Sequence, residues 1–230
     1  MTDINYGHGR KSCIVYSEEK KWFFVHIPKN GGTSFIDKYK SINIDPENKF
    51  NLRHKFISFN ENHNTASYFT KLFPEFASYT PVSIVRNPWS RCLSLYTFNL
   101  KNCIDQKNFG KEWTYYIHTR LTMEGFKQSW MPNGFFRDEN NMQNGIAHNP
   151  KRNWREDDPQ NNWLTDKTKW FKLETQLEDL YDFTGLDKTS MKDVKNPTSH
   201  YDYRLYYDEE LKYEIAKLYK EDIEKFRYTF

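Results

Sequence analysis

Residues 28–34, PKNGGTS, combine the residue types that bind a phosphate or sulfate group. They follow an apolar run that is long enough for one buried strand, and the last two stand where a helix should begin. The adjacent glycines let backbone N–H groups approach an anion, and the helix N-terminus adds the positive end of its dipole. Lys29 contributes a full positive charge. The pattern predicts an anion-binding turn between a strand and a helix.

The order of these residues differs from that of a Walker A loop, in which the lysine follows the glycines and precedes a hydroxyl that binds Mg²⁺. Here Lys29 precedes Gly31 and Gly32. This order argues against a P-loop kinase or NTPase, which would also need carboxylates to hold the metal. An ordinary strand-to-helix turn without a ligand stays open for this stretch taken alone.

A second strand-to-helix turn is predicted in the sequence PVSIVRNPWSRCLSLYTFN. The strand covers residues 82–85, Asn87 is a suitable N-cap, and Pro88 suits the first position of the helix. Arg86 then lies at the carboxyl end of the strand, and Ser94 lies about two turns into the helix. Both side chains can face one crevice, where an arginine and a hydroxyl would form a second anion site.

Two such sites suggest a nucleotide that is phosphorylated at two separate positions. The sequence PKNGGTS resembles the 5′-phosphosulfate loop of sulfotransferases that use 3′-phosphoadenosine-5′-phosphosulfate (PAPS), and RNPWSRCLSLY resembles their 3′-phosphate motif. HIPKNGGTSF together with VRNPWSR is most similar to the carbohydrate sulfotransferase branch, which includes Golgi glycosaminoglycan enzymes and bacterial relatives. The resemblance implies transfer of a sulfuryl group from PAPS to an acceptor hydroxyl, with a carbohydrate as the expected acceptor.

The resemblance also implies a role for each residue of the two motifs. The 5′-phosphate would be held by Asn30, Gly31, Gly32, Thr33 and Ser34, and the 3′-phosphate by Arg86 and Ser94. Lys29 would stabilise the charge that develops on the bridging oxygen of the leaving phosphate. Lysine and backbone dipoles would already neutralise the leaving group, so no metal ion is expected.

Sulfuryl transfer to an alcohol needs a base that removes the hydroxyl proton as the oxygen attacks. Histidine suits this task because its ordinary pKa is about 6.5. Among the 7 histidines, His63 lies in HNTASYF, which resembles the HxTA-like segment that carries the base of the family. His54 is the alternative base. His26 belongs to the first predicted strand, where a packed structural histidine is expected.

The length of 230 residues fits one domain over residues 1–230, with an 18% aromatic content that should dominate its core. The net charge of +3 points neither to nucleic acid nor to a membrane surface. No apolar stretch approaches the roughly 20 residues of a membrane-spanning helix, and the N-terminus lacks the apolar core of a signal peptide. Cys13, Cys92 and Cys103 show no metal-binding spacing. We therefore expect a soluble, cytoplasmic protein of unknown oligomeric state.

The expected fold is α/β, a three-layer P-loop-like domain with a central, mainly parallel sheet flanked by helices. An edge strand is expected at residues 12–16, and a strand at residues 170–173 leads into a helix that Gly185 ends. An amphipathic helix should close the chain, with Asp208 near its start. Residues 101–162 are irregular and rich in aromatic and basic side chains, which suits an acceptor-side loop region.

Two further functions stay open beside the sulfotransferase. One is a P-loop-type nucleotide kinase or NTPase, and the other is a module that binds a glycan or nucleotide without catalysis. Glu174, just after the strand at residues 170–173, is a further acid or base if it does not belong to the scaffold.

Overall fold

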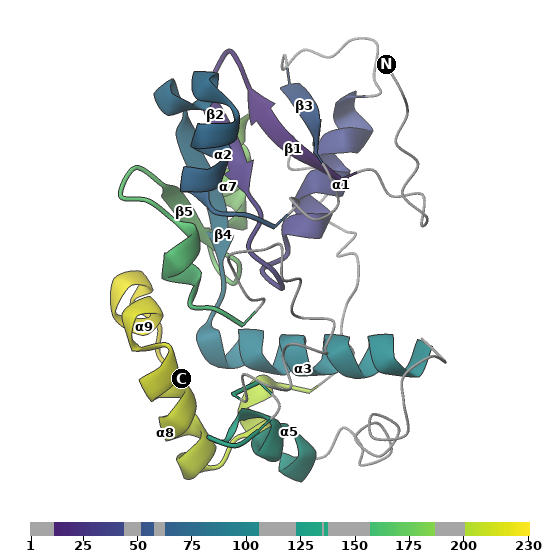
Figure 1. Ribbon diagram of the computed structural model, residues 1–230, viewed down its shortest axis with the longest axis vertical. Helices are drawn as coiled ribbons and strands as arrows, with labels where there is room; N and C mark the ends of the chain where they lie inside the picture. The colour runs from purple at the N-terminus through teal and green to yellow at the C-terminus, as the bar shows by residue number, and fades with distance from the viewer. Residues whose placement is uncertain are drawn as a thin grey trace. The chain divides into compact units, whose positions relative to one another are not determined.

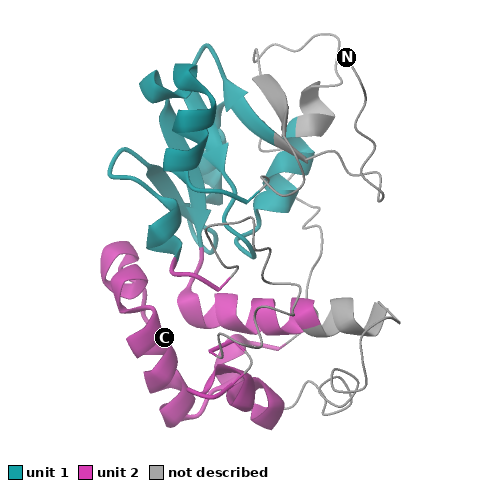
Figure 2. Ribbon diagram, in the orientation of Figure 1, with its two compact units in different colours: residues 1–85, 160–195 teal, residues 86–159, 196–230 magenta. Residues whose placement is uncertain are grey.

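The computed structural model describes residues 12–43, 52–57, 63–105, 123–134, 136–137, 157–186 and 201–230. Figure 1 shows the helices and strands, and Figure 2 colours two compact units. Unit 1 consists of residues 1–85 and 160–195, and unit 2 of residues 86–159 and 196–230. Each unit combines two separate stretches of the chain, and a single domain over residues 1–230 stays a prediction.

Unit 1 contains a five-stranded sheet with the order β3-β1-β2-β4-β5. Its strands are β1 (Ser12–Ser17), β2 (Trp22–Val25), β3 (Leu52–Ile57), β4 (Thr80–Val85) and β5 (Lys169–Lys172). The strands β2, β4 and β5 run parallel, whereas β1 is antiparallel to both of its neighbours. The predicted α/β class is confirmed, and β2 and β4, which lead into the two predicted turns, are neighbours in the parallel part of the sheet.

The predicted edge position of the first strand is wrong. Strand β1 lies between β2 and β3 because β3 pairs with it over its whole length, from Ser12 opposite Ile57 to Ser17 opposite Leu52. No strand is expected at residues 52–57 from the sequence, since their short mixed pattern gives no clear period. The edge strand on this side is β3.

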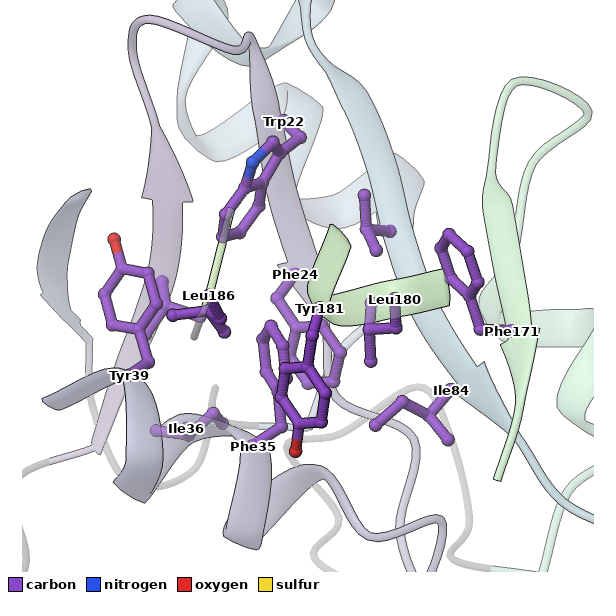
Figure 3. Packing of buried hydrophobic residues seen from close by; sticks show 12 residues of the cluster. Trp22, Phe24, Phe35, Ile36, Tyr39, Ile84, Phe171, Leu180, Tyr181 and Leu186 are labelled. Atoms are coloured by element: carbon purple, nitrogen blue, oxygen red, sulfur yellow. The ribbon is translucent and has the colours of Figure 1, made fainter. Parts of the chain in front are cut away.

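Helices cover both faces of this sheet. They are α1 (Gly32–Asn43), α2 (Ala66–Leu72), α7 (Leu177–Thr184) and the short 3-10 helices η2 (Pro74–Ser78) and η3 (Gln160–Trp163). Successive residues of a strand point to opposite faces, so Trp22 and Phe24 pack with α1 and α7, as Figure 3 shows. Phe23 points to the other face, where its ring stacks on Phe76 of η2 at 4.7 Å between centroids. Burial of each such ring contributes roughly 1.5–3 kcal/mol.

Unit 2 is formed by helices in its described part. They are α3 (Pro88–Asp105), α5 (Met123–Trp130), η5 (Tyr203–Tyr206), α8 (Glu209–Leu218) and α9 (Lys220–Phe226). Their shared core includes Leu93 of α3, Phe126 of α5 and Ile215 of α8. The helix predicted to begin at Pro88 is confirmed. No helix in the described ranges is both long and apolar enough to cross a membrane.

The C-terminal helix predicted as one element is two helices, α8 and α9, which are divided at Tyr219. Tyr219 is 1% exposed, and its hydroxyl donates a 2.7 Å hydrogen bond to the carbonyl oxygen of Asp157. A tertiary contact therefore fixes this residue where local periodicity predicts a continuous helix. Asp208 lies at the start of α8 as predicted, and it caps this helix, because its Oδ1 accepts from the N–H of Leu211 at 2.8 Å.

Candidate functional site

The predicted anion-binding turn connects β2 to α1. Lys29 has a φ of 65° and Gly31 a φ of 80°, while Asn30 between them and Gly32 after them have no positive φ. Residues of alternating φ sign turn successive N–H groups toward one concave surface, which is the backbone pattern of an anion-binding nest. A positive φ is unusual for lysine and strains the backbone. The turn therefore holds the conformation that the glycine-rich sequence predicts, with Lys29 as a residue of that curve.

Both glycines of the turn are required by close contacts. A Cβ atom on Gly31 would lie 2.9 Å from Cδ1 of Leu173, and one on Gly32 would lie 2.2 Å from Cδ2 of His26. Leu173 follows β5, and its N–H donates to the carbonyl oxygen of Val85 at 2.8 Å. The turn is thus packed between two side chains from the ends of the parallel strands β2 and β5, which lie on either side of β4. Any larger residue at either glycine would displace one of them.

The N-terminus of α1 follows directly on the turn. The carbonyl oxygen of Gly31 accepts from the N–H of Phe35 at 3.3 Å, and Gly31 has no side chain that could cap the helix. The first turn of α1 contains no acidic residue, and Thr33 and Ser34 are half-buried. The first N–H groups of an α-helix have no carbonyl partner within the helix and carry the positive end of its dipole. This end of α1 is therefore suited to an anion.

Asn30 anchors the turn with its side chain. It is 1% exposed, and its Nδ2 donates to the carbonyl oxygen of Ile84 at 2.8 Å and to Oε1 of Gln160 at 2.6 Å. Its Oδ1 is buried without a hydrogen-bond partner in the described part of the chain. Since the amide points into unit 1, Asn30 can meet a ligand through its backbone only. No sequence signal indicated Gln160, which is fully buried and lies near the end of the region predicted to be irregular.

His63 lies beside the turn and is oriented by it. Its Nδ1 lies 3.0 Å from the carbonyl oxygen of His26, and Thr65, two residues later, caps α2 by accepting from the N–H of Tyr68. A carbonyl oxygen only accepts hydrogen bonds, so Nδ1 of His63 carries the hydrogen. In the neutral ring, Nε2 of His63 then holds the lone pair and is the nitrogen that takes up a proton.

His26 and His63 form a pair of rings with centroids 4.1 Å apart. Burial of the His26 ring, with smaller contributions from the charges of His63 and Lys29, holds its pKa well below 6.5. His26 is therefore neutral near pH 7. His63 is half-buried and thus more exposed than His26. The expectation of a packed His26 is confirmed by its 5% exposure. The contact of His26 with the N-terminus of α1 was not predicted. Its position two residues before Pro28 is the sequence feature that could have indicated this contact.

The alternative base, His54, lies in β3 and is paired with Val15 of β1. Its side chain lies outside the described residues. Strand β1 separates β3 from β2, so the backbones of β2 and β3 are about 10 Å apart. Of the two candidate bases, His63 is the one that the described contacts bring to the turn.

The second predicted turn, in unit 2, connects β4 to α3. Asn87 caps α3 as predicted, since its Oδ1 accepts from the N–H groups of Trp89 at 3.1 Å and Ser90 at 3.4 Å. Arg86 is half-buried, and its Nε donates to Oγ of Ser90 at 3.0 Å. Ser94 lies one turn further along α3 and is 3% exposed. The structure thus pairs Arg86 with Ser90, a hydroxyl that the sequence motif did not single out.

Other predicted features are scaffold or lie elsewhere. Glu174 is exposed just after β5, and Gly185 ends α7 with a φ of 78° as predicted. The region predicted to be irregular, residues 101–162, contains the end of α3, all of α5 and the start of η3 in its described part. Most of it, including Lys151, Arg152 and Arg155, falls outside the described residues. Within the described ranges, no three His, Cys, Asp or Glu side chains are grouped so that they could hold a metal ion. Models of protein families, curated proteins and solved structures were each compared with the chain, and none matched.

Proposed function

We propose that the protein is a sulfotransferase that moves a sulfuryl group from PAPS to a hydroxyl of an acceptor, with a carbohydrate as the expected class. The observation that carries the proposal is the arrangement at the turn after β2. There, a backbone nest, a lysine and the N-terminus of α1 meet a histidine whose Nδ1 is held by the carbonyl oxygen of His26. An anion cradle beside an oriented base is what sulfuryl transfer to an alcohol requires.

In this proposal, the N–H groups of Gly31, Gly32 and Thr33 hold the 5′-phosphate, with the hydroxyls of Thr33 and Ser34 as further donors. Because the backbone makes these contacts, they need no side-chain rearrangement when the anion arrives. Asn30 contributes by fixing the turn to β4 and to Gln160. The sheet with helices on both faces and this strand–turn–helix cradle support a P-loop-like domain as the fold type.

The chemical step assigns one task each to His63 and Lys29. The acceptor oxygen attacks sulfur, its proton passes to Nε2 of His63, and the bond from sulfur to the 5′-phosphate oxygen breaks. This oxygen leaves as part of adenosine 3′,5′-bisphosphate, and Lys29 stabilises the negative charge that the oxygen gains. The charge on Lys29 also contributes to the lowered pKa of the neighbouring His26 ring.

The assignment of Arg86 and Ser94 to the 3′-phosphate is supported by the sequence motif. In unit 2, Arg86 is half-buried and carries a guanidinium group suited to phosphate. Its contact with Ser90 adds a second hydroxyl to the candidates. Binding of nucleotides that carry only one of the two phosphates tests this assignment separately from the first turn.

The test of the function is transfer of radiolabelled sulfate from PAPS to a panel of glycans, lipids and phenols. We expect label on a glycan, and thermal stabilisation by adenosine 3′,5′-bisphosphate without Mg²⁺. Stabilisation only by ATP with Mg²⁺ would identify a kinase or NTPase instead. Binding of the bisphosphate without transfer to any acceptor would identify a non-catalytic module.

A further inference from the structure

We propose that His26 is a further ligand-binding residue, which donates a hydrogen bond from Nε2 to the anion held at the N-terminus of α1. The identity of that anion, the 5′-phosphosulfate of PAPS, rests on the proposed function. The role of His26 is argued from its own contacts. The resemblance to sulfotransferases assigns no ligand-binding role to this residue.

The ring of His26 lies against the first residue of α1. A Cβ atom built on Gly32 would meet Cδ2 of His26 at 2.2 Å and Nε2 at 2.7 Å. The edge of the imidazole that carries Nε2 therefore faces the helix terminus where the first N–H groups begin. The side chain is 5% exposed, so its position is set by packing between the turn and His63.

The opposite nitrogen has nothing to bond to in the described part of the chain. Nδ1 of His26 is buried and has no hydrogen-bond partner there. A neutral imidazole carries one hydrogen, and on Nδ1 this hydrogen would be a buried donor without an acceptor. On Nε2 it faces the helix terminus, where a bound anion supplies the acceptor. An anion thus supplies an acceptor for the hydrogen of this ring, while Nδ1 remains a buried acceptor without a donor in the described part of the chain.

The charges around His26 keep it a neutral donor. Lys29 and His63 both oppose a positive charge on the ring, and burial opposes it more strongly, so the pKa of His26 is well below its ordinary value. The two histidines consequently have opposite tautomers. His63 carries its hydrogen on Nδ1 and can accept a proton on Nε2, whereas His26 carries its hydrogen on Nε2 and can donate there. One acts as the base, and the other binds the anion.

Three substitutions test this role. His26→Phe keeps the ring and removes both nitrogens, His26→Gln keeps a donor at the reach of Nε2, and Phe24→Leu changes the packing of β2 without a polar atom. The ligands are adenosine 3′,5′-bisphosphate, adenosine 5′-monophosphate, adenosine 3′-monophosphate and inorganic pyrophosphate, with dissociation constants from calorimetry. Thermal unfolding of each variant checks that it is folded.

We expect His26→Phe to weaken binding of the bisphosphate and of the 5′-monophosphate by the same factor. The factor should be about tenfold or more, as for the loss of a hydrogen bond to a charged group. The 3′-monophosphate should bind all variants equally, and His26→Gln and Phe24→Leu should stay within about threefold of wild type. Equal 5′-monophosphate binding by His26→Phe and wild type would overturn the role of His26 and leave the proposed function intact.

Pyrophosphate separates the two hypotheses. If wild type binds pyrophosphate but no adenosine phosphate, PAPS is the wrong substrate, and the ratio of pyrophosphate affinities between His26→Gln and His26→Phe still decides the role of His26. A ratio near one overturns it. If wild type binds none of these anions, both proposals are overturned.

Discussion

The turns after β2 and β4 follow the same strand–turn–helix pattern but satisfy their helix termini in different ways. After β2, Gly31 precedes α1 and has no side chain that could cap this helix. The backbone N–H groups of the turn instead form the nest. After β4, the side chain of Asn87 occupies the N–H groups of Trp89 and Ser90 at the start of α3. An anion at the first turn can therefore be held by the main chain, whereas at the second turn it must be held by side chains such as Arg86.

This difference separates what substitutions should do at each turn. The first turn depends on backbone shape, on two glycines without room for a Cβ atom, and on a buried histidine. The second depends on a charged side chain that can be removed without changing the backbone. Chemistry is expected at the first turn alone, because His63 and Lys29 both lie there.

The largest effect is expected for His63→Ala. Loss of the base should reduce the turnover number by a factor of about 100 to 10,000, with nucleotide binding unchanged. Steady-state transfer and calorimetric binding of the bisphosphate measure the two quantities. If His63→Ala retains full turnover and His54→Ala does not, the base is His54. The claim that the base lies at the first turn would then be wrong.

Lys29→Ala should follow, with a loss in turnover of about 100-fold to 1,000-fold as the leaving phosphate loses its positive partner. Lys29→Gly should lose the same activity and be the more stable of the two variants, because glycine adopts a φ of 65° without strain. Lys20→Ala, at an exposed site in the turn between β1 and β2, is the matched charge control. Equal activity in all three variants would remove Lys29 from the mechanism.

Arg86→Ala should weaken binding of adenosine 3′-monophosphate by about tenfold to a hundredfold, the range for hydrogen bonds to a charged group. Adenosine 5′-monophosphate should bind the variant as it binds wild type. Ser90→Ala and Ser94→Ala, measured in the same way, show which hydroxyl acts with Arg86. A loss of 5′-monophosphate binding in Arg86→Ala would contradict the separation of the two turns.

Acid should destabilise the fold through His26. Its pKa is lowered in the folded state, so between about 6.5 and that lowered value the unfolded chain binds more protons. The free energy of unfolding therefore falls as the pH falls through this window, by at most about 1.4 kcal/mol per pH unit. Denaturant unfolding from pH 7 to pH 5 should show a shallower dependence for His26→Phe. Identical slopes would mean that His26 is not held neutral.

The smallest effect on ligand binding is expected for Asn87→Ala, which removes the cap of α3. The variant also loses the bonds that Nδ2 donates to the hydroxyl of Tyr203 and the carbonyl oxygen of Thr229, so we expect the free energy of unfolding to fall by about 2–3 kcal/mol. Binding of adenosine 5′-monophosphate should be unchanged. Gly32→Ala is the matched change at the first turn, where the added methyl group would meet His26 and reduce 5′-monophosphate binding. Equal binding by both variants would mean that the two turns do not differ as described.

The sequence predicted the elements with strong local signals and missed those set by distant contacts. Asn87 and Pro88 marked the start of α3, and Gly185 the end of α7, because caps and fixed φ angles act within a few residues. The position of β1 inside the sheet depends on pairing with β3, and the break at Tyr219 depends on a contact with Asp157. Neither pairing leaves a local trace.

The same limit applies to the candidate site. The composition of the first turn predicted an anion cradle, and the structure shows a backbone of that shape at Lys29 and Gly31. The inward side chain of Asn30, its bond to Gln160 and the contact of His26 with Gly32 arise only when separate segments pack together. Sequence patterns name the residue types of a site, and packing decides which atoms face it.

The most direct measurement is a crystal structure of the protein with adenosine 3′,5′-bisphosphate. We expect the 5′-phosphate oxygens within about 3 Å of the N–H groups of Gly32 and Thr33 and of Nε2 of His26. Lys29 should contact the same phosphate. A 5′-phosphate bound away from this turn, with His26 and Lys29 unchanged, would contradict the proposed site.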